Sequence, residues 1–100
     1  MKNFFENLDK TLEHRTRLLI TSVLVANDSY DFIALKELLD TTDGNLATHL
    51  KALEREKYIS INKSFIDKKP NTRYKITERG RSAFKKHIDA MEELVKQQKK

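Results

Sequence analysis

The spacing of apolar residues changes twice along this chain, and these changes restrict the fold more than any other feature. Up to Lys57, apolar residues recur every three or four positions, as they do on one face of a helix. From Tyr58 to Ile76 they alternate with polar residues, which is typical of strands. Helical spacing returns after Thr77. The pattern predicts a mainly α, α+β chain in which one two-stranded hairpin lies between helices.

Two amphipathic helices are expected in the first quarter of the chain. The first spans about residues 3–13 and carries one apolar stripe. The members of that stripe are Phe4, Phe5, Leu8 and Leu12. In the second helix, Thr16 is placed to cap the N-terminus. Residues 27–29 end this helix, and a short extended segment at Tyr30 leads into a third, short helix.

A turn at residues 40–44, rich in N-cap residues, introduces a fourth helix over about residues 43–56. Leu46, Leu50 and Leu53 stand at i, i+4 and i+7 in this helix. This spacing puts all three on one face, which we expect to be buried. The opposite face is polar and is left for solvent or a partner.

The hairpin and a long last helix complete the predicted order. A strand of about eight residues begins near Tyr58, and the tip at residues 67–71 contains the single proline. The last helix, about residues 77–97, begins at Thr77 as N-cap with Glu78 in its first turn. Its far end is apolar through Ile88, Met91, Leu94 and Val95.

Size and composition limit the class of protein. One hundred residues, 38% of them hydrophobic, form one modest core, so we predict a single domain over residues 1–100. The longest apolar stretch, residues 18–26, is far shorter than the ~20 residues that cross a bilayer, and the first ten residues lack the apolar run of a secretory signal. We therefore expect a cytoplasmic protein without a membrane segment.

The chemistry-bearing residues do not assemble into a catalytic or metal site. The chain has no cysteine, and His14 and His87 have no partner at metal-ligand spacing. Neither a glycine-rich phosphate loop nor a nucleophile elbow is present. We predict no metal, no cofactor and no enzymatic activity.

Positive charge is concentrated in the second half of the chain. The formal net charge is +5, but residues 1–50 contain five basic and eight acidic side chains. Residues 45–86 contain twelve basic and four acidic side chains, a net of +8. A run of this kind is often only a solvated surface, but it also suits an anionic partner such as nucleic acid.

Three segments, in this order, resemble a known family. Residues 43–54 (DGNLATHLKALE) look like the recognition helix of winged-helix transcriptional regulators of the MarR/ArsR type. Residues 12–18 (LEHRTRL) and 74–81 (YKITERGR) match the segments before that helix and after the wing. The likeness covers about residues 8–95. Within the family, the chain is most similar to small stand-alone winged-helix proteins that contain little beyond the domain and its terminal helices. It implies a winged helix-turn-helix fold whose wing is the hairpin of about residues 59–76.

One position departs from the family pattern. Members usually have a glycine between the recognition helix and the first wing strand, where the backbone often turns left-handed, but this chain has Lys57. Holding another residue in that conformation costs about 1 to 2 kcal/mol. The sequence therefore leaves the conformation of this turn open, while the predicted fold is unchanged.

The polar face of helix 43–56 has the size and chemistry to read a DNA major groove, which admits one α-helix. Asn45 can bond an adenine edge, and Lys51 can reach phosphates. The resemblance adds the wing, which would touch the backbone or the adjacent minor groove. The residues expected to contact DNA are Thr42, Gly44, Asn45, Thr48, His49, Lys51 and Arg55 around the helix, and Lys68, Lys69, Asn71 and Arg73 on the wing.

Each of these residues also has a structural interpretation. Asn45 and Thr48 are ordinary solvated helix residues if no DNA binds, and the wing lysines then serve solubility alone. His49 is either a DNA contact or a packed boundary residue, because its neighbour Leu50 is expected to be buried. The sequence leaves these alternatives open.

The terminal helices are expected to form a homodimer, since their apolar stripes lie outside the helix-turn-helix core. The expected interface consists of Phe4, Phe5, Leu8, Leu12, Ile88, Met91, Leu94 and Val95. The alternative is that the two stripes pack on each other within one chain. Regulators of the resembled type are homodimers, which implies a pseudo-palindromic double-stranded DNA site. The rival functions are a protein-protein adaptor without sequence-specific DNA binding and a regulator with a small-molecule effector.

Overall fold

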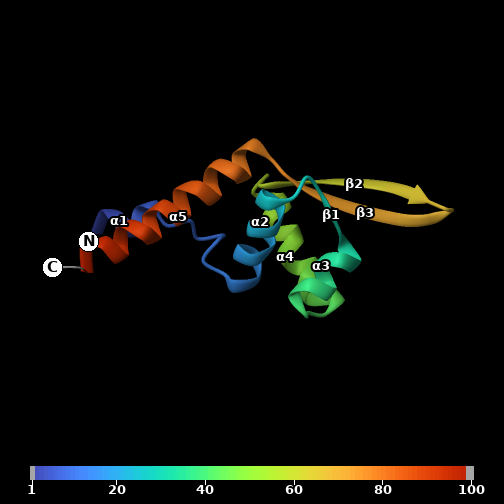
Figure 1. The fold of residues 1–100 in the computed structure, drawn as a ribbon, viewed down its shortest axis with the longest axis horizontal. Helices are drawn as coiled ribbons and strands as arrows, with labels where there is room; N and C mark the ends of the chain where they lie inside the picture. The colour runs from blue at the N-terminus through green and yellow to red at the C-terminus, as the bar shows by residue number, and fades with distance from the viewer. Residues whose placement is uncertain (1, 99–100) are drawn as a thin grey trace.

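The computed structural model describes the backbone of residues 2–98 and the side chains from residue 5 onward (Figure 1). Its elements are α1 (Lys2–Asn7), α2 (Arg15–Ala26), β1 (Tyr30–Asp31), α3 (Phe32–Leu39), α4 (Asp43–Arg55), β2 (Ile59–Ile66), β3 (Lys69–Ile76) and α5 (Glu78–Gln98). This is the order predicted from the sequence. The winged helix-turn-helix, with α3 and α4 as its two helices and β2 and β3 as the wing, is confirmed.

The molecule is elongated, with principal-axis extents of 59, 26 and 21 Å. Figure 1 shows α2, α3 and α4 in the middle, with the wing extending from them in one direction and α5 in the other. Helix α1 lies along α5, so both ends of the chain are at the end opposite the wing tip. None of the helices in this described part combines the length and apolarity needed to span a membrane.

The core lies between α2, α3, α4 and the base of the wing. Leu46, Leu50 and Leu53 are all buried there, as their spacing predicts. They pack with apolar residues of the other elements, which include Ile20, Leu24, Leu35, Ile59, Tyr74 and Ile76. Burial of one face fixes the rotation of α4 about its axis, and so it determines which side chains α4 presents outward.

The sheet is antiparallel in the order β1-β3-β2, so the predicted extended segment joins the base of the wing as a short third strand. In the wing, Ile61 pairs with Tyr74 and Ile66 pairs with Lys69. The connection therefore contains only Asp67 and Lys68, both left-handed, with φ of 50° and 67°. Left-handed residues at both central positions are typical of a tight hairpin turn. The expected tip at residues 67–71 is thus too long, since residues 69–71 belong to β3.

The first helix is shorter than expected and ends at Asn7. Beyond it, Asp9 Oδ1 accepts hydrogen bonds from the backbone N–H groups of Thr11 and Leu12, at 2.9 and 3.2 Å. This turn directs the Leu12 side chain into the core, where none of its surface is exposed. The assignment of Leu12 to an interface between copies is therefore wrong. Phe4, from the same stripe, lies outside the residues whose side chains are described.

Asp9 also connects the N-terminal segment to two distant elements. Its backbone N–H donates to His87 Nδ1 on α5 at 2.9 Å, and its Oδ2 accepts from the Tyr58 hydroxyl. Burial, followed by this hydrogen bond, raises the pKa of Tyr58 to about 12, so the hydroxyl remains a donor at neutral pH. His87 has a structural role, as its isolation in the sequence suggests.

Two helix ends differ from expectation. His14, not Thr16, caps α2, because its Nδ1 accepts the Thr16 backbone N–H at 3.2 Å. After α4, Lys57 does adopt the left-handed conformation, with φ of 63°. The Lys57 N–H donates to Glu54 O at 2.8 Å and the Tyr58 N–H to Leu53 O at 3.0 Å. These two bonds satisfy the last carbonyls of the helix in the usual glycine-type ending, so the turn that the sequence left open keeps the family's left-handed geometry without a glycine.

Candidate nucleic-acid interface

Helix α4 begins at an open, polar surface. Thr42 is its N-cap, and the hydroxyl accepts the Asn45 backbone N–H at 3.1 Å. The Asn45 side chain is exposed, and its amide donates once, to Thr41 Oγ1 at 2.7 Å. One amide N–H and the carbonyl oxygen are then left for a partner, which is what a bidentate bond to adenine needs. A methyl group placed on Gly44 would meet no atom within 4 Å, so the backbone here is accessible.

The outward face continues along α4 with Thr48, Lys51 and Arg55, all exposed. The Thr48 hydroxyl donates to the Gly44 carbonyl at 2.9 Å, which leaves its oxygen free to accept. Neither Lys51 nor Arg55 has a carboxylate within 4.0 Å among the described residues. The face therefore combines hydrogen-bonding groups near the helix start with unpaired positive charge further along.

His49 faces inward and is only 7% exposed. Its Nδ1 accepts a hydrogen bond from Arg17 Nε on α2 at 3.1 Å, and its ring lies 4.0 Å, centroid to centroid, from that of His14. Burial, and then the nearby His14 and Arg17, lower the pKa of His49 below its usual 6.5. Of the two alternatives, packing is correct and DNA contact is not. Its spacing from Leu46 and Leu53 would have shown this, since both intervals are those of one helix face.

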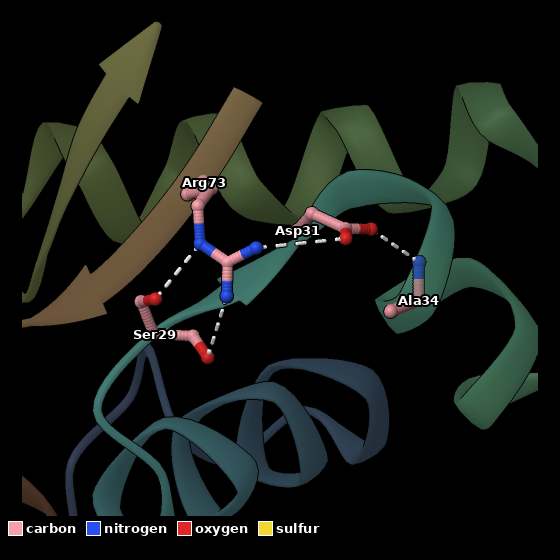
Figure 2. Close-up of polar contacts among 4 residues, drawn as sticks. All are labelled: Ser29, Asp31, Ala34 and Arg73. Atoms are coloured by element: carbon pink, nitrogen blue, oxygen red, sulfur yellow. Dashed lines mark hydrogen bonds and ion pairs between the residues drawn. The ribbon is translucent and has the colours of Figure 1, made fainter. Parts of the chain in front are cut away.

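The Arg73 side chain on β3 is bound by Ser29 and Asp31, at the start of β1 and α3 (Figure 2). Its Nε donates to Ser29 Oγ at 2.9 Å, a second guanidinium nitrogen donates to Ser29 O at 3.4 Å, and the third lies 3.7 Å from Asp31 Oδ2. The other oxygen of Asp31 accepts the Ala34 N–H at 2.7 Å and so caps α3. Arg73 therefore fixes the start of the helix-turn-helix to the wing, a structural role that the sequence did not predict.

The wing tip carries the other expected contacts. Lys68 and Lys69 are exposed and have no carboxylate within 4.0 Å in the described part of the chain. Asn71 is half-buried, and its Oδ1 is buried without a hydrogen-bond partner. The two lysines thus remain available to an anion, whereas Asn71 does not point freely to solvent.

A groove separates α4 from the wing. It is lined by Ala47, Leu50, Lys51, Glu54, Ile61, Lys63 and Tyr74. Lys51 from the helix and Lys63 from the strand thus face the same depression. Sequence reasoning did not single out Lys63 or the exposed apolar Phe65 and Ile66 that follow. The signal was present in the alternation of β2, where Lys63 and Phe65 follow Ile59 and Ile61 on one face.

Within residues 2–98, no three histidine, aspartate or glutamate side chains gather closely enough to hold a metal ion. The positively charged face formed by α4 and the wing is the principal candidate site. Its chemistry is that of a surface for an anionic, hydrogen-bonding partner.

Comparison with known proteins shows the family of the chain. The model of the winged helix DNA-binding domain family matches residues 16–95. The chain belongs to this family. An uncharacterized protein of Methanocaldococcus jannaschii is 41% identical to this winged-helix chain over 80 residues, which cover 80% of the chain and 87% of that protein.

Solved structures resemble the whole winged-helix chain. A transcriptional regulator homologue from Pyrococcus horikoshii OT3 has a TM-score of 0.90 and 26% identity, with both chains fully covered. MepR from S. aureus, solved in complex with DNA, has a TM-score of 0.73 and 16% identity over 97% of this chain and 82% of its own. A MarR family regulator from Silicibacter pomeroyi has a TM-score of 0.65 and 18% identity, covering 92% and 64%. The last two likenesses concern the fold.

Proposed function

We propose that this winged-helix protein is a homodimeric, cytoplasmic transcriptional regulator that binds double-stranded DNA of defined sequence. The observation that carries the proposal is the outward face of α4. Asn45, Thr48 and Lys51 are exposed at successive three-residue intervals on a helix whose opposite face is buried in the core. A single helix with one free polar face is the element that fits a major groove.

In this proposal the start of α4 reads bases. Asn45 offers the donor and acceptor pair that matches adenine, and Thr48 accepts from a base amino group or contacts a phosphate. The unpaired N–H groups of the first turn and the accessible backbone at Gly44 favour a phosphate oxygen nearby. Lys51, Arg55, Lys68 and Lys69 provide contacts to phosphates, which add affinity without sequence preference.

The dimer is proposed from apolar surface at the end opposite the wing. Although α1 packs along α5, Phe5, Met91 and Val95 remain 65%, 42% and 58% exposed, and Ile88 is also exposed. Leu8 and Leu94 are half-buried. Packing within one chain therefore covers only part of the two stripes, and a second copy would cover the rest. Two-fold symmetry would then require a pseudo-palindromic site with half-sites about 34 Å apart.

Fluorescence anisotropy with duplexes selected from a random pool tests the DNA-binding proposal. With about 6 to 10 phosphate contacts per dimer, affinity is expected to fall about 10³- to 10⁵-fold between 50 and 200 mM salt. Asn45→Ala should relax the preference for the selected sequence over random DNA. Failure to bind any duplex at 50 mM salt refutes the proposal, and equal losses on selected and random DNA show that Asn45 does not read bases.

Light scattering tests the dimer. The intact protein is expected to have twice the 11.8 kDa mass of one chain at micromolar concentration, and the double variant Met91→Asp, Leu94→Asp is expected to have the single mass. A single mass for the intact protein contradicts the dimer. An unchanged double mass for the variant places the interface away from α5.

A protein adaptor is the second candidate, and one observation favours it. Ile33 and Leu38 of α3 are 69% and 54% exposed, outside both the proposed DNA face of α4 and the proposed dimer surface. Exposed apolar side chains of this kind are common where proteins meet. Ile33→Ser combined with Leu38→Ser should leave DNA binding intact, because neither residue is on the outward face of α4.

A further inference from the structure

One face of the wing is continuous with the recognition helix. Side chains alternate along β2, so Ile59, Ile61, Lys63 and Phe65 share a face. Ile59 is buried, and Ile61 and Lys63 line the groove beside α4. Phe65 comes next on this face, beyond the end of the groove. Its ring is therefore on the side of the wing that α4 also occupies.

Nothing in the described chain covers this ring. Phe65 is 75% exposed, more than any other large hydrophobic residue whose side chain the structure describes. Its cross-strand partner is Pro70, which is also exposed. The turn at Asp67 and Lys68 closes the hairpin immediately beyond, so the two apolar side chains form a narrow ridge close to the tip.

The charges around the ridge favour a polyanion over an apolar protein surface. Lys63, Lys68 and Lys69 are exposed and have no carboxylate within 4.0 Å among the described residues. Lys63 shares the face of Phe65 and Lys68 lies in the adjacent turn, whereas Lys69 pairs with Ile66 and lies on the opposite face. The two ammonium groups nearest the ring suit the phosphates on either side of a groove. Desolvating them against an apolar protein surface would be unfavourable.

The position of the ring also matches the repeat of DNA. At about 3.3 Å per residue, six residues of strand place Phe65 about 20 Å from Ile59, which packs at the base of the wing. Half of one DNA turn, from the centre of a major groove to the adjacent minor groove, is about 17 Å. The wing is therefore long enough for Phe65 to reach the minor groove next to the major groove that α4 is proposed to enter.

We propose that Phe65 is an apolar wedge that enters the minor groove next to the half-site read by α4 and bends the DNA there. This inference rests on the proposed function and deepens it. Apolar side chains that enter the minor groove partly unstack a base step and bend the duplex by about 20 to 90° toward the major groove. Lys63 and Lys68 would contact the phosphates near the ring, and Pro70 would stiffen the neighbouring strand.

The test is a bending measurement separate from affinity. A selected duplex, labelled at its two ends, reports the end-to-end distance by energy transfer when saturated with intact protein. The bound duplex is expected to be bent, and Phe65→Ala is expected to straighten it and to reduce affinity roughly tenfold. Phe65→Leu should retain most of the bend, because a smaller apolar group can still enter the groove.

Ile66 offers a matched control, since it is apolar, 54% exposed and on the opposite face of the same strand. Ile66→Ala should leave both bend and affinity unchanged. Lys68→Ala with Lys69→Ala should weaken binding, yet the saturated duplex should still be bent. Thermal melting followed by circular dichroism checks that all variants fold.

The outcomes distinguish failure of the wedge from failure of the proposed DNA-binding function. If intact protein binds no duplex, the proposed function fails. If it binds and the bound duplex is straight, or if Phe65→Ala bends DNA as intact protein does, the wedge is refuted while DNA binding stands. Equal effects of Phe65→Ala and Ile66→Ala also refute it, since they would show that neither face of the wing is specifically inserted.

Discussion

The backbone of Gly80 lies directly against the carbonyl group of Tyr58. A methyl group built on Gly80 would be 2.1 Å from the Tyr58 carbonyl oxygen and 2.8 Å from its carbon. The same carbonyl accepts the Thr77 N–H at 3.0 Å, and the Thr77 hydroxyl accepts the Gly80 N–H at 2.9 Å. The first turn of α5 is thereby fixed to the chain just after α4.

Gly80→Ala is expected to destabilise the protein by about 3 kcal/mol or more, because a backbone carbonyl cannot move aside as a flexible side chain can. This corresponds to a fall in Tm of about 15 °C for a domain of this size. Gly44→Ala is the control, since its methyl group meets nothing, and it should be neutral or stabilising by up to about 1 kcal/mol. Similar melting curves for the two variants would contradict the prediction.

Lys57→Gly is expected to stabilise the protein. Lys57 has φ of 63°, a conformation that costs a non-glycine residue about 1 to 2 kcal/mol. Glycine removes this cost but loses more entropy on folding, so we expect a net gain of about 0.5 to 1 kcal/mol in the free energy of unfolding. Urea denaturation measures it. A lower midpoint for the variant would show that the lysine side chain contributes contacts that outweigh the strain.

His49 is expected to make stability depend on pH. Its pKa is held below 6.5 in the folded chain, first by burial and then by His14 and Arg17. As pH falls, the unfolded chain takes up this proton first. The contribution of the neutral ring is therefore complete above pH 6.5, and it is lost as the pH falls from 6.5 through the lowered pKa.

His49→Gln removes this titration but keeps an acceptor for Arg17. The stability of the intact protein relative to this variant should be constant above pH 6.5 and should decrease below it, as followed by urea midpoints from pH 8 to pH 5. His87 is present in both chains, so its effect cancels, whereas the influence of His14 on His49 is part of the measured difference. A difference independent of pH would contradict the assignment.

Substitution of Arg73 should affect stability, whereas substitution of the wing lysines should affect the salt dependence of DNA binding. Arg73→Ala should cost about 1 kcal/mol of stability, discounted for the partial exposure of its partners, and leave the salt dependence of DNA binding unchanged. Lys68→Ala with Lys69→Ala should leave stability within about 0.5 kcal/mol and reduce the salt slope of the dimer by about 4, since two lysines are lost from each protomer. A reduced slope for Arg73→Ala would mean that its guanidinium leaves Ser29 to bind a phosphate.

The parts of the fold that follow from local periodicity were predictable from the sequence. Leu46, Leu50 and Leu53 fixed the buried face of α4, and the alternation after Tyr58 located the wing. Asn45 and Thr48 could therefore be assigned correctly to the exposed face. What they contact is not tested by the fold.

The parts that depend on distant partners were not predictable. Arg73 bonds to Ser29, 44 residues away, and no spacing rule connects the two. The first helix ends early because Asp9 binds Tyr58 and His87, which are 49 and 78 residues away. In both cases a polar residue that the sequence alone would place on the surface bonds to an element that only the tertiary fold brings near.

The contacts of Asp9 make the two ends of the molecule mechanically one piece. Tyr58 follows α4 by three residues, and its hydroxyl is bound to the same aspartate whose N–H is bound to α5. These two bonds fix the terminal helices to the chain just after the helix proposed to read DNA. In the proposed dimer, a small rotation of one pair of terminal helices against the other would therefore move both α4 helices by a larger distance. The spacing between half-sites that the dimer accepts would then be determined at the terminal helices, far from the DNA.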